Sequence, residues 1–482
     1  MMTWLVIFGA IYLLFLSFTS YLANRENNMA DPQDPKAFAI GGGNINMFLG
    51  VLTYSATLFS TFTLMGMPNF FRTHGVGAWI FLGVTDVAMT FIVLFIGLKI
   101  HKTFKKEKFY SVGTFLRHKY NSKYAAYIFL LGIFVFLVPY MAIQIKGISS
   151  FLEVAAPIKL SEVYWSIVML SIILTYSSVG GFKAIVYSDA IQGTILLFVV
   201  WIICYNCLDF AGGLSNMFQT LKTQSPQSVK LLSTPGPKNL LNFQFLFASF
   251  IAIIAMPITQ PQLTTRLIAM KSEKTLKKMA PSVAFFAIAV ILPATFIGMY
   301  GAIKFADSTT QEFWFQVLIQ EQPVALGALA LIGLIAAAMS TTDSQLFALG
   351  NEASIFLEKD RNVQSKTKLL ILLFTLTSLL FSIFSDNGLV QLARVSFSGT
   401  ALLAPMILLS IYSKEKTSLN LLTPLFTLAS LLFFIYTTFL NTQIKTILSI
   451  RVDLFLFMAL SIVAIINFFT ANKAYQGVKL ND

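Results

Sequence analysis

Charged residues are scarce in this 482-residue chain: Asp, Glu, Lys and Arg make up 11% of it, whereas a soluble globular domain carries about 25%. Hydrophobic residues make up 56%. This composition excludes a soluble domain, a disordered chain and a fibrous protein. Two Cys and three His residues leave little scope for a disulfide framework or a zinc site. A polytopic membrane protein remains.

Candidate catalytic groups are equally scarce. Cys204 and Cys207 form a C-x-x-C pattern, but it lies inside an apolar run with no neighbouring βα pattern, so we interpret both as packing residues. His74, His101 and His118 share no metal-ligand spacing. With no nucleophile–base pair or metal cluster in the sequence, we do not expect an enzyme.

Apolar stretches long enough to cross a bilayer, about 20 residues, recur along the whole chain. The sequence predicts an all-α fold with about 13 transmembrane helices, at 4–22, 46–70, 77–98, 124–150, 163–178, 187–209, 242–265, 281–303, 324–350, 367–384, 388–411, 418–440 and 453–471. The first has no preceding basic residues and no small-residue cleavage site, so we expect a retained helix rather than a signal peptide. The longest intervening segment, 211–241, has room for one short surface helix.

The 34 Lys and Arg residues are divided unevenly between the two sets of loops. Twenty-four lie in 23–45, 99–123, 179–186, 266–280, 358–368, 412–417 and the C-terminal tail, and eight lie in the alternate loops. Because cytoplasmic loops are rich in Lys and Arg, we predict a multi-pass protein of the inner (plasma) membrane with its N-terminus outside and its C-terminus in the cytoplasm. The net charge of +13 then reflects topology, and no nucleic-acid partner is needed.

The span count favours an inverted repeat. If 1–45 is a peripheral leading helix with a cytoplasmic loop, 46–210 and 242–411 each hold five spans, joined by an extracellular loop at 211–241. Because five is odd, the second unit enters the membrane in the opposite orientation. Residues 412–482 would add two peripheral helices and a short tail.

The leading span of each five-helix unit is predicted to be broken. The first carries a run of hydroxyl residues from Thr53 to Thr63, followed by Gly66 and Pro68, and the second contains Pro257 and Pro261. Proline removes a backbone donor, and unwound backbone at membrane depth is tolerated only where it is buried in protein or lines a cavity. Two matched breaks predict a binding site near the midplane, although hydroxyls that pack helices and ordinary proline kinks remain an alternative.

The ninth span contains a dense run of oxygen-bearing side chains from Ser340 to Gln345, preceded by three alanines. A charged Asp343 deep in a bilayer is costly and needs a partner or a cation. Sodium, as a hard ion, prefers oxygen ligands. Candidate ligands are the side chains of Ser340, Thr341, Asp343 and Ser344 with the carbonyls of Ala56, Phe59 and Ala337. In the alternative interpretation, these hydroxyls bond to their own helix and Asp343 lies at the water boundary.

Asp189 allows two interpretations. With Ser188 it follows a cytoplasmic turn, where the pair would cap a helix N-terminus. Alternatively, Asp189 faces the ninth span and shares a cation or a proton with it.

Three motifs resemble the sodium:solute symporter family. They are Gly180-Gly181-Phe182-Lys183-Ala184 with Ser188-Asp189-Ala190-Ile191-Gln192, the run from Ala336 through Ser340 and Thr341 to Leu346, and Pro257-x-x-Gln260 with Arg266-x-x-Ala269-x-Lys271-Ser272. The similarity extends from Phe38 through the tenth span. Ser188 stands where the family usually has Thr, Gly43 where it has Arg, and Leu58 where proline carriers have Asp. Stretches at 211–216 and 144–153 resemble the pantothenate branch.

The resemblance implies the inverted-repeat fold of the bacterial leucine transporter and Na+ as the coupled ion. It implies a main sodium site at Ala56, Phe59, Ala337, Ser340 and Thr341. Residues matching Asp189, Asp343 and Ser344 hold a second sodium in some relatives, and here we expect them to bind a second cation or a proton.

The family's solute pocket is lined by both broken helices and by the third and fourth spans. The candidate solute-binding residues are therefore Ser60, Thr63, Thr85, Asp86, Tyr140, Gln144 and Gln260. Asp86 stands out because an intramembrane carboxylate is by default a functional candidate, although a salt bridge to another helix would also explain it. Lys146 could snorkel or bind an anionic solute, and Arg394 is a candidate for an outer gate.

The sequence thus predicts a sodium-coupled secondary active symporter that imports a small polar organic solute, such as an amino acid, vitamin, sugar or carboxylate, by alternating access. The protein is expected to be a monomer in the lipid bilayer. Two alternatives stay open: a proton-coupled carrier on the same fold, and a sensor that binds solute without transporting it.

Overall fold

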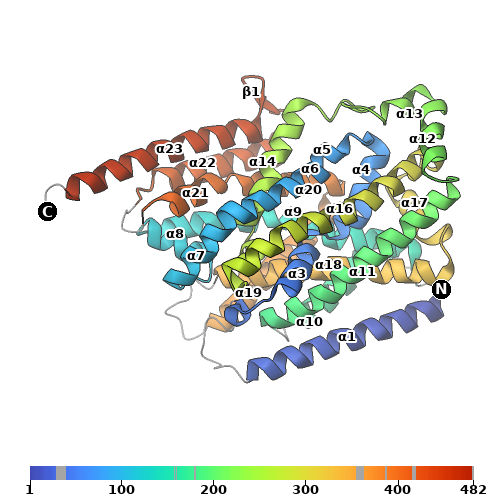
Figure 1. Cartoon of the computed structure of the whole chain (residues 1–482), viewed down its shortest axis with the longest axis horizontal. Coiled ribbons are helices and arrows are strands. Elements are labelled where there is room, and N and C mark those ends of the chain that lie inside the picture. The colour runs from blue at the N-terminus through green and yellow to red at the C-terminus, as the bar shows by residue number, and fades with distance from the viewer. Residues whose placement is uncertain are drawn as a thin grey trace.

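The computed structural model is a bundle of long helices that lie roughly parallel to one another (Figure 1). It describes residues 1–28, 40–156, 158, 160–177, 181–353, 363–385, 388–414 and 419–479. Phe38 and Gly180 of the sequence motifs, together with 358–362 of the predicted loop at 358–368, lie outside the described residues.

The first half of the chain is helical throughout its described part. Its elements are α1 (Met2–Asn28), η1 (Gly41–Gly43), α3 (Met47–Leu58), η2 (Phe62–Gly66), α4 (Met67–His74), α5 (Ala78–Phe81), α6 (Gly83–Ile92), η3 (Val93–Gly97), α7 (Leu98–Glu107), α8 (Val112–Lys119), α9 (Lys123–Ala155), α10 (Glu162–Ser177) and α11 (Gly181–Phe210).

The second half adds further helices and one two-stranded hairpin. Its elements are α12 (Leu214–Thr223), α13 (Pro226–Lys230), α14 (Phe243–Thr259), α15 (Pro261–Ala269), α16 (Glu273–Lys304), α17 (Thr310–Phe315), η4 (Gln316–Gln320), α18 (Val324–Ala353), α19 (Val363–Phe384), α20 (Leu389–Ala401), α21 (Ala404–Tyr412), α22 (Leu422–Ile435), η6 (Tyr436–Leu440), β1 (Thr446–Ile447), β2 (Ile450–Arg451) and α23 (Val452–Lys479).

Within the described residues, nine helices are long and apolar enough to cross a membrane, and two bent helix pairs raise the number to as many as 11. Two shorter apolar helices, Glu162–Ile172 and Leu369–Phe384, lie where the sequence predicts spans at 163–178 and 367–384. The structure therefore supports a polytopic all-α protein with 9 to 11 spans.

Both predicted broken helices are bent in the structure. The first bends by 60° between α3 and the segment Phe62–His74, and the second bends by 51° between α14 and α15. The residue after each first half, Phe59 and Gln260, has extended backbone angles, which ends the helix. Pro261 follows as the first residue of α15, a position where its missing N–H costs nothing. Pro257, by contrast, lies inside α14 without ending it.

The two broken helices lie side by side at one end of each. Ile45, just before α3, pairs with Met270, just after α15, through backbone hydrogen bonds from Ile45 N to the Ala269 carbonyl (3.1 Å) and from Lys271 N to the Ile45 carbonyl (2.9 Å). The start of the first broken helix and the end of the second therefore lie side by side.

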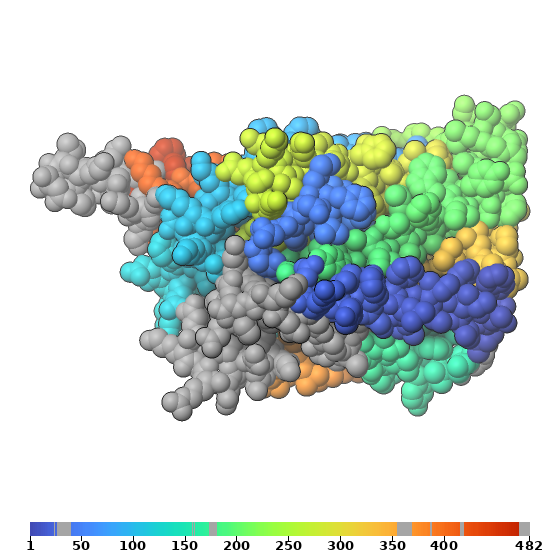
Figure 2. All heavy atoms as spheres, turned by 60° about the horizontal axis from the view of Figure 1, so that its bottom comes forward, coloured from blue at the N-terminus to red at the C-terminus, as the bar shows by residue number. Residues whose placement is uncertain are grey.

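Burial separates central helices from peripheral ones. In the most apolar window of each span, 83% of the residues of α9 and 72% of those of α18 are buried, against 17% for α1 and 28% for α23. In Figure 1, α1 lies along one edge of the bundle, and α23 extends from the opposite side. Figure 2 shows α1 lying across one face of the molecule. The span Leu389–Tyr412, which comprises α20 and α21, is also 83% buried, so α9, α18 and this span form the core of the bundle.

One prediction about the loops was wrong in detail. Segment 211–241 holds two short helices, α12 and α13, rather than one, because Ser225 and Pro226 stop the first and cap the second. The predicted loop after the twelfth span contains the hairpin of β1 and β2, which pairs Thr446 with Arg451.

Candidate functional site

The end of α3 leaves backbone carbonyls without helical partners, as every helix C-terminus does. Here, side chains from two other helices satisfy them. Ser340 of α18 donates to the Ala56 carbonyl (2.6 Å) and Thr341 donates to the Thr57 carbonyl (3.4 Å). Tyr140 of α9 donates to the Leu58 carbonyl at 3.4 Å. The break is thus held by hydroxyls from the two central helices.

Three of the five predicted sodium ligands, Ala56, Ser340 and Thr341, meet at this point. Of the other two, Phe59 occupies the turn that ends α3, and Ala337 lies one helical turn before Thr341 on α18. All five residues are buried. Hydroxyl and carbonyl oxygens are ligands that a hard cation prefers, and a serine hydroxyl can turn a lone pair toward an ion that displaces its hydrogen bond. The donor set therefore fits sodium.

A second cluster surrounds Arg266 of α15. Its guanidinium is 1% exposed and forms an ion pair with Asp189 of α11, which is 0% exposed, at 2.6 Å. The same nitrogen donates to Ser344 of α18 at 2.6 Å, while Nε donates to the Thr53 hydroxyl of α3 at 2.9 Å. Thr53 in turn donates to Asp189 at 2.6 Å. Four helices thus converge on one buried cation.

This cluster corrects two interpretations of the sequence. Asp189 is not part of a helix N-cap, because α11 begins at Gly181, and Ser188 and Asp189 lie two turns inside it. Arg266 was counted among the cytoplasmic loop residues at 266–280, but it lies in α15 and is buried. Of the predicted second-site residues, Asp189 and Ser344 both contact Arg266, and Asp343 is buried beside Ser344 on α18.

Four predicted solute-binding residues lie around the first break. Thr63 accepts from Ser60 N at 3.0 Å, and Gln144 accepts from Thr61 N at 3.2 Å. The Tyr140 hydroxyl reaches the Leu58 carbonyl beside them. Their hydrogen bonds hold the unwound backbone in place, so each has a structural role here in addition to any contact with solute.

The remaining three predicted solute-binding residues are Thr85, Gln260 and Asp86, and their polar groups differ in how many hydrogen-bond partners they have. Thr85 donates back to the Phe81 carbonyl of its own chain segment. Gln260, at the second break, accepts from Gln262 at 2.8 Å, but its amide nitrogen is buried without a partner. Asp86 of α6 is 6% exposed and has no hydrogen bond or ion pair through its carboxylate with any residue that the structure describes.

Aromatic residues that the sequence did not single out flank the breaks. Phe59 stacks on Phe286 of α16, with ring centroids 5.9 Å apart, and Tyr140 meets Phe397 of α20 edge-on at 5.2 Å. With 47 Phe residues in the chain, no local pattern distinguishes these from the many that pack the core.

Two basic residues considered from the sequence have local partners. Lys146 donates to the Ser385 carbonyl. Arg394 donates to Gln391 at 3.0 Å, and its guanidinium lies over the Phe245 ring at 4.7 Å. Neither contacts the helix breaks through these bonds.

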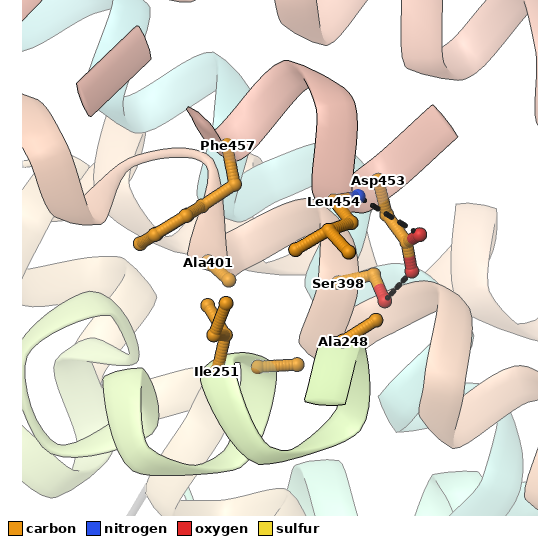
Figure 3. Close-up of a pocket in the computed structure, with 8 residues that line it drawn as sticks. Ala248, Ile251, Ser398, Ala401, Asp453, Leu454 and Phe457 are labelled. Atoms are coloured by element: carbon orange, nitrogen blue, oxygen red, sulfur yellow. Dashed lines mark hydrogen bonds between the residues drawn. The ribbon is translucent and has the colours of Figure 1, made fainter. Parts of the chain in front are cut away.

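A separate small pocket lies where α23 packs on α14 and α20 (Figure 3). Its one acid, Asp453, accepts from Ser398 (2.9 Å), from Leu454 N (3.0 Å) and from Arg451 (2.7 Å). The other residues that line it are Ala248, Ile251, Ala252, Ala401, Leu454 and Phe457. The polar groups here are already satisfied, so the pocket is a poor candidate for a solute site.

The described part of the chain contains no group of three or more His, Cys, Asp or Glu residues that could hold a metal ion. Cys204 and Cys207 are free and buried.

Among curated proteins, a sodium/pantothenate symporter of Haemophilus influenzae is 24% identical over 334 residues, which cover 68% of this chain and 66% of that protein. The match thus spans just under two thirds of that relative's length. A sodium/proline symporter of Salmonella typhimurium is 23% identical over 435 residues, which cover 84% of this chain and 82% of that protein.

Among solved structures, a substrate-bound, outward-open Na+-coupled sialic acid symporter has a TM-score of 0.72 and 18% identity, and the match covers 96% of this chain and 97% of that one. MhsT in complex with L-phenylalanine has a TM-score of 0.55 and 14% identity, with coverage of 88% and 98%. These two structures share the fold of this chain. The model of the sodium:solute symporter family matches residues 38–423, which is most of the chain, and the protein therefore belongs to that family.

Proposed function

We propose that the protein is a sodium-coupled secondary active symporter that imports a small polar organic solute by alternating access. Family membership makes it a transporter rather than an enzyme and gives Na+ as the coupled ion. Inward movement of one sodium ion releases about 2.3 kcal/mol per 100 mV of membrane potential, in addition to its concentration gradient. The observation that carries the proposal is the pair of α18 hydroxyls on the carbonyls that end α3.

In the proposed mechanism, sodium enters between α3 and α18. The Ser340 and Thr341 hydroxyls turn from the Ala56 and Thr57 carbonyls, and hydroxyl and carbonyl oxygens together bind the ion. Phe59 and Ala337 supply further carbonyls. Because the ion bridges a broken helix to a central one, its arrival stabilises one arrangement of the two over others, which couples ion binding to access.

From the sequence, Asp189, Asp343 and Ser344 are the candidates for binding a second cation or a proton. In the structure, Arg266 already supplies a positive charge to Asp189 and a donor to Ser344. A second ion would therefore have to displace the guanidinium, and we propose that this cluster instead links the four helices mechanically while Ser340 and Thr341 bind the coupled sodium.

We also propose the 5+5 inverted repeat of 46–210 and 242–411, with 1–45 and 412–482 peripheral and 211–241 outside. The bend in the leading span of each unit, 60° in the first and 51° in the second, supports the repeat, and the slight burial of α1 and α23 supports their peripheral place. The basic loops support an external N-terminus and a cytoplasmic C-terminus. We expect a monomer in the plasma membrane.

The solute-binding residues proposed are Ser60, Thr63, Thr85, Asp86, Tyr140, Gln144 and Gln260. Support comes from their position around the two helix breaks, where unwound backbone and side-chain groups can both reach a ligand. The named solutes of the two curated relatives, pantothenate and proline, are small polar molecules of the kind expected.

Uptake into proteoliposomes tests the proposal. Candidate solutes are offered with an inward sodium gradient, with choline in place of sodium, and with sodium plus a protonophore. We expect uptake that needs sodium and survives the protonophore, and a rise of at least 10-fold in the sodium concentration for half-maximal uptake in Ser340→Ala and Thr341→Ala.

The matched control is Ser378→Ala, because this buried serine donates only to the Phe374 carbonyl of its own helix. Its sodium dependence should equal that of wild type. Wild-type sodium affinity in both α18 variants would refute the site assignment. Uptake that ignores sodium and collapses with the protonophore would favour the proton-coupled alternative, for which the uncompensated Asp86 is the specific candidate.

A further inference from the structure

Buried acids in this protein are compensated by identifiable partners, with one exception among the residues that the structure describes. Asp189 pairs with Arg266, and Asp453 pairs with Arg451. Glu352 accepts from the backbone N–H groups of Val112 and Gly113, both at 2.8 Å, at the start of α8. Asp343 also has a partner.

Asp86 is the exception. Its side chain is 94% buried, since only 6% of its surface is exposed, and its carboxylate has no hydrogen bond or ion pair with any described residue. Its oxygens are nevertheless not among the fully enclosed polar atoms without partners, so they border a space that a small group can reach. A buried carboxylate without a counter-charge is costly, and a ligand can supply that counter-charge.

Three basic side chains that the sequence places in or at the ends of spans have partners other than Asp86. Arg266 is held by Asp189, Lys146 by the Ser385 carbonyl, and Arg394 by Gln391 and the Phe245 ring. The missing counter-charge of Asp86 is therefore not explained by a small displacement of one of these basic side chains.

The surroundings of Asp86 belong to the helix breaks. The carboxylate lies close enough to the hydroxyls of Tyr54 and Tyr140 to act on both electrostatically. Its helix, α6, packs against α14, which ends at the second break, and against α16, which carries Phe286. Asp86 thus lies near Tyr140, whose hydroxyl donates to the Leu58 carbonyl at the first break, and on a helix that packs against α14.

Two further polar groups of this region are buried and lack partners. They are the Tyr54 hydroxyl and the amide nitrogen of Gln260. Both can donate a hydrogen bond, whereas the Asp86 carboxylate can only accept. The region therefore offers one negative acceptor and two neutral donors to a ligand, with the Phe59–Phe286 and Tyr140–Phe397 aromatic pairs beside the breaks.

This arrangement suits an organic cation better than a second sodium ion. Sodium needs several oxygen ligands around it, but the hydroxyls of Thr85 and Thr90 on α6 are turned to the Phe81 and Val87 carbonyls. An ammonium group needs only a few acceptors, and aromatic faces also attract it.

We propose that Asp86 binds the protonated amino group of the transported solute, while Tyr54 and Gln260 donate hydrogen bonds to an acceptor group, such as a carboxylate, on the same molecule. This inference rests on the proposed function and narrows its solute class to compounds that carry both an ammonium group and an acceptor.

Paired compounds test the inference. Purified protein in sodium chloride is screened by thermal shift with the common amino acids and with matched analogues in which a hydroxyl or ether oxygen replaces the amino nitrogen, such as alanine with lactate. We expect stabilisation by one or more amines and none by their oxygen analogues. Asp86→Asn should weaken that binding at least 10-fold, and Asp86→Glu should weaken it less.

The matched control is Thr90→Val, one turn away on α6, whose hydroxyl donates only to its own helix; it should bind like wild type. The shift caused by sodium alone should persist in Asp86→Asn, which shows that the variant is folded. Equal binding of amines and oxygen analogues, unchanged amine binding in Asp86→Asn, or a screen in which no amine binds would overturn the inference.

The thermal-shift screen and the uptake assay together separate this inference from the proposed function. Binding of amines that depends on Asp86, together with uptake that ignores sodium, would contradict sodium coupling alone. Sodium-driven uptake of a solute without an amino group would contradict the inference alone. If Asp86→Asn keeps its amine preference but loses the pH dependence of uptake, Asp86 carries a proton instead.

Discussion

Arg266 contacts residues of four helices through one guanidinium, and three of these contacts are to side chains at 2.9 Å or less. A buried charge of this kind is stabilising only while its partner is present, because removing either member leaves the other uncompensated. Arg also supplies donors in a fixed planar geometry that Lys does not reproduce.

We therefore predict that Arg266→Gln destabilises the protein by about 3–5 kcal/mol, seen as a lower midpoint of thermal unfolding in detergent. Arg266→Lys should lose part of this stability. The double variant Arg266→Gln with Asp189→Asn should be more stable than Arg266→Gln alone, because no charge is left unpaired.

The control is Lys106→Gln, which removes an exposed pair with Glu107 at 3.9 Å and should change stability by less than about 1 kcal/mol. Unaltered stability of Arg266→Gln, or a double variant that loses more stability than the two single changes together, would contradict this account of the cluster.

The sequence singled out the residues of the proposed sodium site, but not Arg266. Ser340 and Thr341 follow three alanines inside an apolar run, so their oxygens stand out from their neighbours. Arg266 lies at the end of an apolar run, where hydropathy assigns a charge to the adjacent loop. Its partner Asp189 is 77 positions away in the chain, and such a pairing becomes visible only once the helices are packed.

In the two broken helices too, the local sequence predicts one feature, and tertiary contacts determine another. Proline predicted that both spans would be interrupted, and Pro261 does begin the second half of its helix. The first break, however, lies at Phe59, several residues before Gly66 and Pro68. There, hydroxyls of α9 and α18 cap the carbonyls. This break depends on tertiary contacts, which explains why the local sequence located the span but not the residue.

The second half of the first broken helix, α4, is held closely against α16. A Cβ atom added at Gly298 would lie 2.5 Å from the Pro68 carbonyl oxygen and 2.6 Å from Phe71 Cβ. We predict that Gly298→Ala separates α4 from α16 and destabilises the protein by about 1–3 kcal/mol, measured by thermal unfolding.

Gly388→Ala provides the matched control, because an added Cβ there meets no atom of the described residues within 4 Å and the backbone φ is −66°. This change should be neutral. A Gly298→Ala variant as stable as Gly388→Ala would show that α4 and α16 are not in the close contact described.

The division of basic residues between the loops predicts which side of the membrane each loop faces. The fold alone does not define this orientation. The native Cys204 and Cys207 should not react with a thiol reagent, since both are 0% exposed. We predict that in intact cells a membrane-impermeant thiol reagent labels Lys222→Cys in the proposed outer loop and does not label Lys106→Cys.

After permeabilisation, Lys106→Cys should be labelled as well, because Lys106 is exposed in the structure. The unmodified protein should stay unlabelled throughout. Labelling of Lys106→Cys but not Lys222→Cys in intact cells would reverse the proposed orientation of every helix.

The all-α fold class and both interrupted helices were accessible from the sequence because each depends on hydropathy or on proline along one stretch of chain, whereas the predicted count of about 13 spans compares with 9 to 11 in the described residues. The solute class was not accessible in this way. It depends on which faces of α3, α6, α9 and α14 meet, and on the fact that Asp86 finds no counter-charge among the described residues.

Equilibrium binding of radioactive ²²Na+ to the purified protein tests the central claim most directly, because it needs no knowledge of the solute. We predict saturable sodium binding to wild type and to Ser378→Ala, and a loss of at least 10-fold in affinity in Ser340→Ala and in Thr341→Ala. Sodium binding of wild-type affinity in both α18 variants, with the folded state verified by thermal unfolding, would contradict a sodium site between α3 and α18.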